Sequence, residues 1–249
     1  MKLILCKLFG WYCVTQPTPI VKPIEVTKPI EPVASIEQVV MANGCKDHYF
    51  KERGKPPLAF IMGIAYTYKQ AKCSQNFVGL VTVPHKGVKD VMQHYGLAPN
   101  LQNIFTLLVG LGMRESSGRH CTGRDMSAGF STSQSAEAGL WQTSYDARYL
   151  DKNLPEYSDK WAGECFLEHY SKNITCSQND WKYWGTELSG RLFQEKAKKC
   201  PAFHAEYTAI TMRANKNHFG PFYGSRKVAE FVPACLELFE KLNTVIQCN

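Results

Sequence analysis

The stretch that decides the fold is Gly112-Met-Arg-Glu115-Ser-Ser-Gly118, which is followed along the chain by Gly139-Leu-Trp-Gln142. Before it, apolar residues recur at helical spacing, at Leu101, Ile104, Phe105, Leu107, Leu108 and Leu111. This spacing predicts a helix that carries Glu115 on its last turn, with one side packed and the other open. Ser116, Ser117 and Gly118 are expected to end this helix.

A carboxylic acid at the end of an apolar helix is partly desolvated, and desolvation raises its pKa toward neutrality. Such a group can hold a proton near neutral pH and donate it to a glycosidic oxygen. Glu115 is therefore the candidate general acid. The alternative is a solvated glutamate at a helix C-terminus with no catalytic role.

The two motifs resemble the signature of the lysozyme-like superfamily of lytic transglycosylases and goose-type lysozymes, Glu-Ser-x-x-Gly followed by Gly-Leu-Met-Gln. They read here Glu115-Ser-Ser-Gly118 and Gly139-Leu-Trp-Gln142, so that Trp141 replaces the usual methionine. The resemblance covers residues 100–144 and, more weakly, the chain to about Leu242. It implies a mainly α, lysozyme-like domain that cleaves the β-1,4 bond between N-acetylmuramic acid and N-acetylglucosamine in peptidoglycan.

The resemblance also implies which residues contact the substrate. The transglycosylase pattern has a serine nine positions before the glutamine and a small residue six before it, and Ser133 and Ala136 stand there. A late Tyr-Asn-Ala-Gly segment of the family is only partly matched, by Ala214-Asn215 and Gly220. The expected substrate-binding residues are Ser116, Ser133, Gly139, Trp141, Gln142, Tyr207 and Asn215. His218 receives no family role.

The mechanism depends on a second carboxylate. A hydrolase needs a base or a nucleophile at a set distance from the acid, and Asp125, Glu137 and Asp146 are the candidates. Asp125 is preferred because it lies in an insertion, residues 119–127, that resembles the goose type; it could equally cap a turn with Ser127. In lytic transglycosylases a single acid also acts as base, and the muramic acid residue itself closes a 1,6-anhydro ring, so Glu115 alone would suffice.

Composition is consistent with one exported domain. The chain has 249 residues, 44% of them hydrophobic, and a formal net charge of +7. A basic surface is attracted to the anionic peptidoglycan wall. The Lys and Arg residues are scattered and no nucleic-acid-binding signature is present, so we expect glycan strands as partner and no nucleic acid, cofactor or metal.

Eight cysteines in the domain are the second strong signal: Cys45, Cys73, Cys121, Cys165, Cys176, Cys200, Cys235 and Cys248. They form no CxxC motif, which favours four disulfides over zinc ligands. Their pairing is open, because eight cysteines allow 105 connectivities. Disulfides predict a periplasmic or extracellular location. The alternative is that several are reduced core residues.

The N-terminal part divides into two segments. Residues 1–14 are a weak leader, a membrane anchor or a misassigned start, because Lys7 interrupts a short apolar run. Residues 15–35 are a Pro-rich linker in which Lys22-Pro-Ile-Glu25 recurs as Lys28-Pro-Ile-Glu31. Proline at this density favours a semi-rigid spacer. The catalytic domain is expected over residues 36–249.

Helical spacing of apolar residues predicts further helices at residues 88–95, 160–170, 181–199, 202–214 and 225–242. Residues 59–68 are either helix or strand. The fold class is thus mainly α and disulfide-stabilised. Besides the transglycosylase, three functions stay open: a goose-type hydrolase of peptidoglycan or chitin, a catalytically inactive glycan-binding module, and a disulfide-rich interaction protein.

Overall fold

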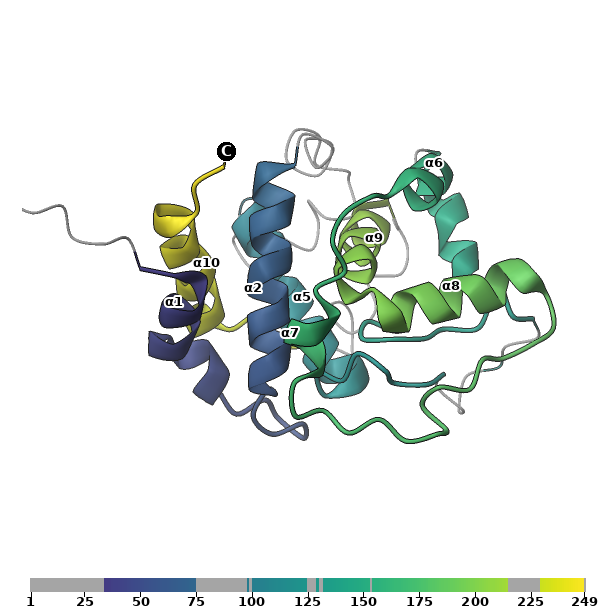
Figure 1. Ribbon diagram of the computed structural model, residues 1–249, viewed down its shortest axis with the longest axis horizontal. Helices are drawn as coiled ribbons and strands as arrows, with labels where there is room; N and C mark the ends of the chain where they lie inside the picture. The colour runs from purple at the N-terminus through teal and green to yellow at the C-terminus, as the bar shows by residue number, and fades with distance from the viewer. Residues whose placement is uncertain are drawn as a thin grey trace, which may run out of the picture. The chain divides into compact units, whose positions relative to one another are not determined.

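Helix α5 (Leu101–Ser116) is the central helix of the fold (Figure 1). The structure is a computed structural model and describes residues 34–74, 98, 100–124, 129, 132–152, 154–214 and 229–248. The chain divides into two units, residues 1–32 and 33–249, and all described residues lie in the second. In α5, 13 of the 16 residues are buried, so the helix is covered nearly all round instead of on one face.

Three long helices pack against α5: α2 (Leu58–Cys73), α9 (Pro201–Ala214) and α10 (Pro233–Val245). Tyr68 of α2, Phe105 of α5 and Phe239 of α10 meet with ring centroids 4.9 to 5.7 Å apart. Aromatic rings at this spacing combine a large buried apolar area with favourable edge-to-face contacts. This cluster joins the central helix to the first and last long helices of the chain.

The remaining helices are short or peripheral. They are α1 (Ile36–Ala42), η1 (Gly44–Asp47), η3 (Tyr145–Leu150), α6 (Leu154–Lys160), α7 (Leu167–Ser171) and α8 (Leu188–Lys199). Helix α7 packs against α2, and α8 packs against α9. Among the described residues there is no strand, only two isolated bridges, so the prediction of a mainly α fold is confirmed.

Several predicted helix boundaries were wrong, because side chains far away in the sequence hold the backbone. Residues 161–166 are not helical: Glu164 N–H donates to Gln70 Oε1 at 2.7 Å, and Phe166 has φ 51°. Residues 181–187 are also irregular, and α8 begins only at Leu188. The last helix starts at Pro233. The predicted helix at residues 88–95 lies outside the described residues, and residues 58–73 are helix, not strand.

Four disulfides tie the helices together, as predicted. They are Cys45–Cys235, Cys73–Cys248, Cys121–Cys176 and Cys165–Cys200. Cross-links of this number persist in an oxidising, non-cytoplasmic compartment. No helix within the described ranges is long and apolar enough to cross a membrane.

The segment just before α10, which includes Glu230, packs on α5 at Gly110. A Cβ at this position would lie 2.0 Å from the backbone oxygen of Glu230, far inside contact distance. Gly110→Ala should therefore lower the free energy of unfolding by about 1–3 kcal/mol through overpacking. Urea denaturation with the disulfides intact measures this change.

Gly44→Ala is the matched control, because its Cβ would meet Ala234 Cβ at an ordinary 3.8 Å. We expect it to change stability by less than about 1 kcal/mol. Equal losses in the two variants would contradict the close approach at Gly110.

Candidate functional site

Glu115 lies half-buried on the last turn of α5, where the sequence predicted it. The helix ends at Ser117, which adopts a left-handed conformation with φ 54°, and at Gly118 with φ 74°. The N–H groups of Ser117 and Gly118 donate to Met113 O at 3.0 Å and Gly112 O at 3.1 Å. These bonds satisfy carbonyls that the helix end leaves free, and they fix the turn that carries the acid.

The second motif, Gly139-Leu-Trp-Gln142, forms a tight turn. Ala138 and Thr143 flank the turn, and Ala138 N–H donates to Thr143 O at 3.1 Å. Within the turn, Gly139 has φ 76° and Gln142 has φ 47°. The Gln142 amide donates to Gly139 O at 2.8 Å and to Gly123 O at 3.0 Å. The glutamine side chain therefore closes its own turn and links it to the segment that follows α5.

The structure brings the two motifs together. The indole N–H of Trp141 donates to Leu108 O of α5 at 2.8 Å. A Cβ on Gly112 would lie 2.5 Å from Leu140 Cδ2, so the absence of a side chain at Gly112 lets the turn press against α5. The last turns of α5, which hold Glu115, thus rest directly on the Gly139–Gln142 turn.

Three residues expected to contact substrate are buried beside Glu115. Trp141 is 2% exposed and packs in the core against Phe60 and His204. The structure therefore places this ring in the core, and its contact with substrate stays a prediction. Ser116 and Gln142 are also buried, and Ser116 Oγ donates to Gly112 O at 2.9 Å. These side chains support the backbone around the acid.

Ser133 is likewise buried, and it bonds the segment before the second motif to Glu187, the residue that precedes α8. Its Oγ lies 2.6 Å from Glu187 Oε2, and its N–H donates to the same oxygen at 3.0 Å. The hydrogen bonds from Ser133 lower the pKa of Glu187 to about 2. Sequence reasoning missed Glu187, although it directly precedes the amphipathic run of α8, where an N-cap is expected.

His204 of α9 lies beneath the Gly139–Gln142 turn. It is fully buried, its Nε2 is 2.7 Å from Thr143 Oγ1, and a Cβ on Gly139 would lie 2.9 Å from its Nδ1. Burial lowers the pKa of His204 to about 3, so the ring is neutral at physiological pH. The sequence analysis did not single out His204 as a residue of the site. The apolar residues around it in α9 indicate burial only weakly.

Tyr207 stands one turn further along α9 and is fully buried. Its hydroxyl donates to Ser144 O at 3.0 Å, which ties α9 to the residues that follow the turn. Burial raises the pKa of Tyr207, so the phenol stays protonated. Tyr207 thus packs in the interior next to the residues that follow the turn, and its role in substrate binding stays a prediction.

Two of the three candidate second carboxylates, Glu137 and Asp146, lie among the described residues. Asp125 lies outside them, as do Asn215 and His218. Glu137 is half-buried next to the Ala138–Thr143 bridge, and Asp146 is exposed on η3. Glu115 itself provides a carboxyl group on a helix end whose backbone is fixed, and proton donation requires such a group.

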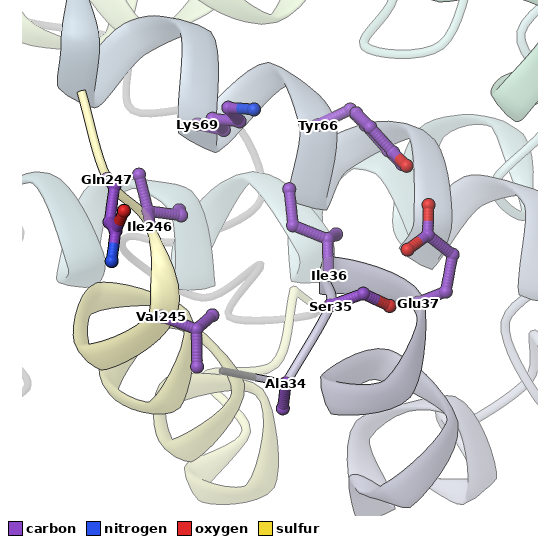
Figure 2. A pocket seen from close by; sticks show the side chains of 9 residues that line it. All are labelled: Ala34, Ser35, Ile36, Glu37, Tyr66, Lys69, Val245, Ile246 and Gln247. Atoms are coloured by element: carbon purple, nitrogen blue, oxygen red, sulfur yellow. The ribbon is translucent and has the colours of Figure 1, made fainter. Parts of the chain in front are cut away.

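Two other features contain none of the predicted site residues. Figure 2 shows a pocket of about 460 Å³ whose lining includes Ser35, Glu37, Tyr66, Lys69 and Ile246, and none of the predicted site residues. Among the described residues, the side chains of His120, Cys121 and Cys176 form a group with metal-ligand chemistry. The Cys121–Cys176 pair is a disulfide here.

Burial of neutral His204 predicts a loss of stability in acid. Its folded pKa of about 3 lies below the ordinary value of 6.5, so the unfolded state binds a proton first as the pH falls. The free energy of unfolding should therefore decline from pH about 7 to about 4, with a contribution of at most about 1.4 kcal/mol per pH unit. His204→Gln should flatten this decline in denaturation curves recorded across that range.

Thr143→Val is the control, because it removes the hydrogen bond to His204 but leaves the imidazole buried. It should lower stability at neutral pH and keep the acid-side decline. A His204→Gln protein with the full wild-type decline would show that other groups cause it.

The resemblance to the lysozyme-like superfamily rests on the two sequence motifs alone. No protein-family model matches the chain, and no match is found among curated proteins or among solved structures.

Proposed function

We propose that this chain is a lysozyme-like enzyme that cleaves the β-1,4 bond between N-acetylmuramic acid and N-acetylglucosamine in peptidoglycan, with Glu115 as the general acid. The observation that supports it is the packing of the Gly139–Gln142 turn against the last turns of α5. The two segments that carry the family resemblance are distant in sequence, yet they meet at Gly112, three residues before the glutamate that the resemblance makes catalytic.

The geometry suits a proton donor that must stay in place. Glu115 sits on a helix whose end is fixed by the bonds of Ser117 and Gly118, and the helix itself is buried nearly all round. A general acid is effective when its carboxyl group is held at the glycosidic oxygen without a search among rotamers and backbone states. The rigid end of α5 supplies that constraint.

We propose a lytic transglycosylase over a hydrolase, because Glu115 alone can perform both proton transfers. It would protonate the leaving glycosidic oxygen and then, as carboxylate, accept the proton of the C6 hydroxyl that closes the 1,6-anhydro ring. A hydrolase would need a second carboxylate, for which Asp125 is the sequence candidate. The positive net charge and an oxidising compartment fit work on an anionic wall outside the cytoplasm, in the periplasm or the cell exterior.

Glu115→Gln tests the acid. The amide keeps the size of the side chain and removes its transferable proton, so release of fragments from purified peptidoglycan should fall by at least about 100-fold. Glu156→Gln is the matched control: Glu156 is exposed on α6, where it pairs with Lys160, and its loss should leave the rate unchanged. Full activity of a folded Glu115→Gln protein would show that Glu115 is not the general acid.

The released products separate the alternatives. A transglycosylase should yield muropeptides about 18 mass units lighter than hydrolysed ones, because the anhydro ring forms without water. Mass spectrometry of the digest reads this difference. Reducing ends would instead indicate a hydrolase and make Asp125 the next residue to substitute. Binding to peptidoglycan with no release would indicate a glycan-binding module, and neither binding nor release an interaction protein.

A further inference from the structure

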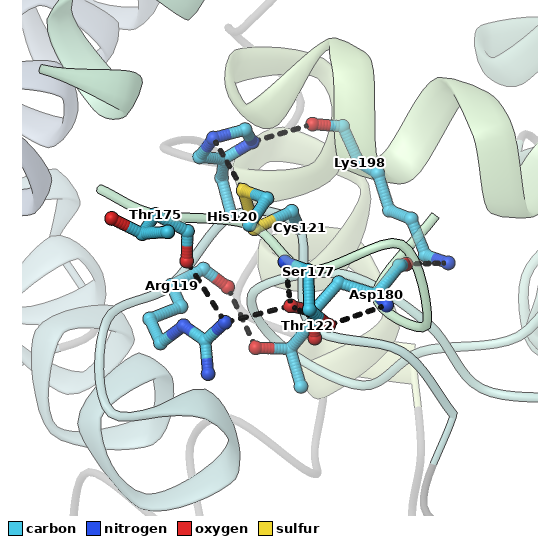
Figure 3. A network of polar contacts seen from close by, with 9 residues as sticks. Arg119, His120, Cys121, Thr122, Thr175, Ser177, Asp180 and Lys198 are labelled. Carbon is cyan, nitrogen blue, oxygen red and sulfur yellow. Dashed lines mark hydrogen bonds and ion pairs between the residues drawn. A yellow bond between two sulfur atoms is a disulfide. The ribbon is translucent and has the colours of Figure 1, made fainter. Parts of the chain in front are cut away.

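A second group of reactive side chains lies where the segment after α5 meets the loop before α8. His120 and Cys121 come from the first segment and Cys176 from the second, and the disulfide Cys121–Cys176 joins them (Figure 3). One ligand atom from each of the three lies within 4.8 Å of the others. Two sulfurs and an imidazole nitrogen are the donor types that zinc and other soft cations prefer.

The hydrogen bonding of His120 leaves its Nε2, the nitrogen that faces Cys176, available to bind a metal ion. Its Nδ1 is 2.9 Å from Lys198 O, a carbonyl that can only accept, so Nδ1 carries the hydrogen. The side chain is buried, and in this tautomer the second ring nitrogen has no hydrogen. Nε2 therefore carries a lone pair, and it lies 3.7 Å from Cys176 Sγ. Metal-binding histidines commonly have this arrangement, with the other N–H donated to a backbone carbonyl.

The spacing fits a tetrahedral ion. With Zn–S of about 2.3 Å and Zn–N of about 2.0–2.1 Å, sulfur and nitrogen ligands stand about 3.6 Å apart and two sulfurs about 3.8 Å apart. The separation of Cys176 Sγ from His120 Nε2, 3.7 Å, already has this value. Only the two sulfurs must move apart, and they can do so once the bond between them is cleaved.

The surroundings allow both access and support. Cys176 is half-buried between the exposed residues Thr175 and Ser177, whereas Cys121 is buried, so the disulfide is nearest to solvent on its Cys176 side. On the same loop, Asp180 accepts hydrogen bonds from Arg119 at 2.8 Å and from Ser177 N–H at 2.7 Å (Figure 3). The Ser177 bond closes a turn within the loop, and the Arg119 bond ties the loop to the segment after α5 independently of the disulfide.

We propose that His120, Cys121 and Cys176 form a three-ligand zinc site when the Cys121–Cys176 disulfide is reduced. The reductant is a dithiol, which supplies two electrons and two protons: the S–S bond breaks, two cysteine thiols form, and the dithiol becomes a cyclic disulfide. Zn²⁺ then displaces the two thiol protons and binds two thiolates and Nε2, with water as the fourth ligand. The metal and the disulfide are thus alternative cross-links of the same two segments.

The test is a titration of the full-length protein with Co²⁺ and then Zn²⁺ after reduction by a phosphine, which binds zinc weakly. Reduced wild type should bind one equivalent of Co²⁺ with the absorption of tetrahedral thiolate coordination, and Zn²⁺ should displace it. The oxidised protein should show no such absorption. Cys176→Ala should abolish the signal, and His120→Ala should weaken Zn²⁺ binding at least about 10-fold.

Reduction opens the other three disulfides too, so a paired control is needed. The double variant Cys165→Ser/Cys200→Ser removes a different disulfide and should keep the full metal affinity. Alkylation followed by peptide mass mapping adds a second measurement: Zn²⁺ should protect Cys121 and Cys176 in reduced wild type but not in His120→Ala. Metal binding that survives Cys176→Ala, or a reduced chain that binds no Zn²⁺, whether folded or not, would overturn the proposal.

Discussion

The burial of α5 on nearly every side is the constraint on which the rest of the structure depends. A helix that is apolar all round must be covered by several others, and α2, α9 and α10 together provide that cover. Close approach to its backbone needs positions without side chains, which Gly110 and Gly112 supply. The backbone of Glu115 is held in place because the helix that carries it cannot shift without disturbing the whole core.

The sequence was sufficient for the features that depend on local pattern. The apolar spacing of residues 101–111 predicted α5, and the Ser-Ser-Gly segment predicted its end, because the capping hydrogen bonds lie within one turn. The even number of domain cysteines predicted four disulfides, although their pairing depends on the tertiary fold. The juxtaposition of the two motifs could be expected from the resemblance but not from spacing.

The rest depends on contacts between distant segments. Residues 161–166 and 181–187 have apolar residues at helical spacing, yet side chains of α2 and α8 bind their backbone in irregular conformations: Gln70 accepts from Glu164, and Gln194 bonds both N–H and C=O of Trp184. For the same reason, sequence position placed Trp141 and Ser133 near substrate, whereas they are buried. A motif identifies which residues lie near an active centre, but not which layer each occupies.

The disulfides Cys45–Cys235 and Cys73–Cys248 give the domain an unusual covalent topology. They span 190 and 175 residues, and both connect the first helices to the last one. Each cross-link closes a ring of its own, and the polypeptide from Cys73 to Cys235 lies within both rings. A protease that cuts this segment once leaves a single covalent molecule, with both fragments still held around α5. In an oxidising compartment, where both cross-links persist, such rings let one loop be cleaved without releasing either half of the core.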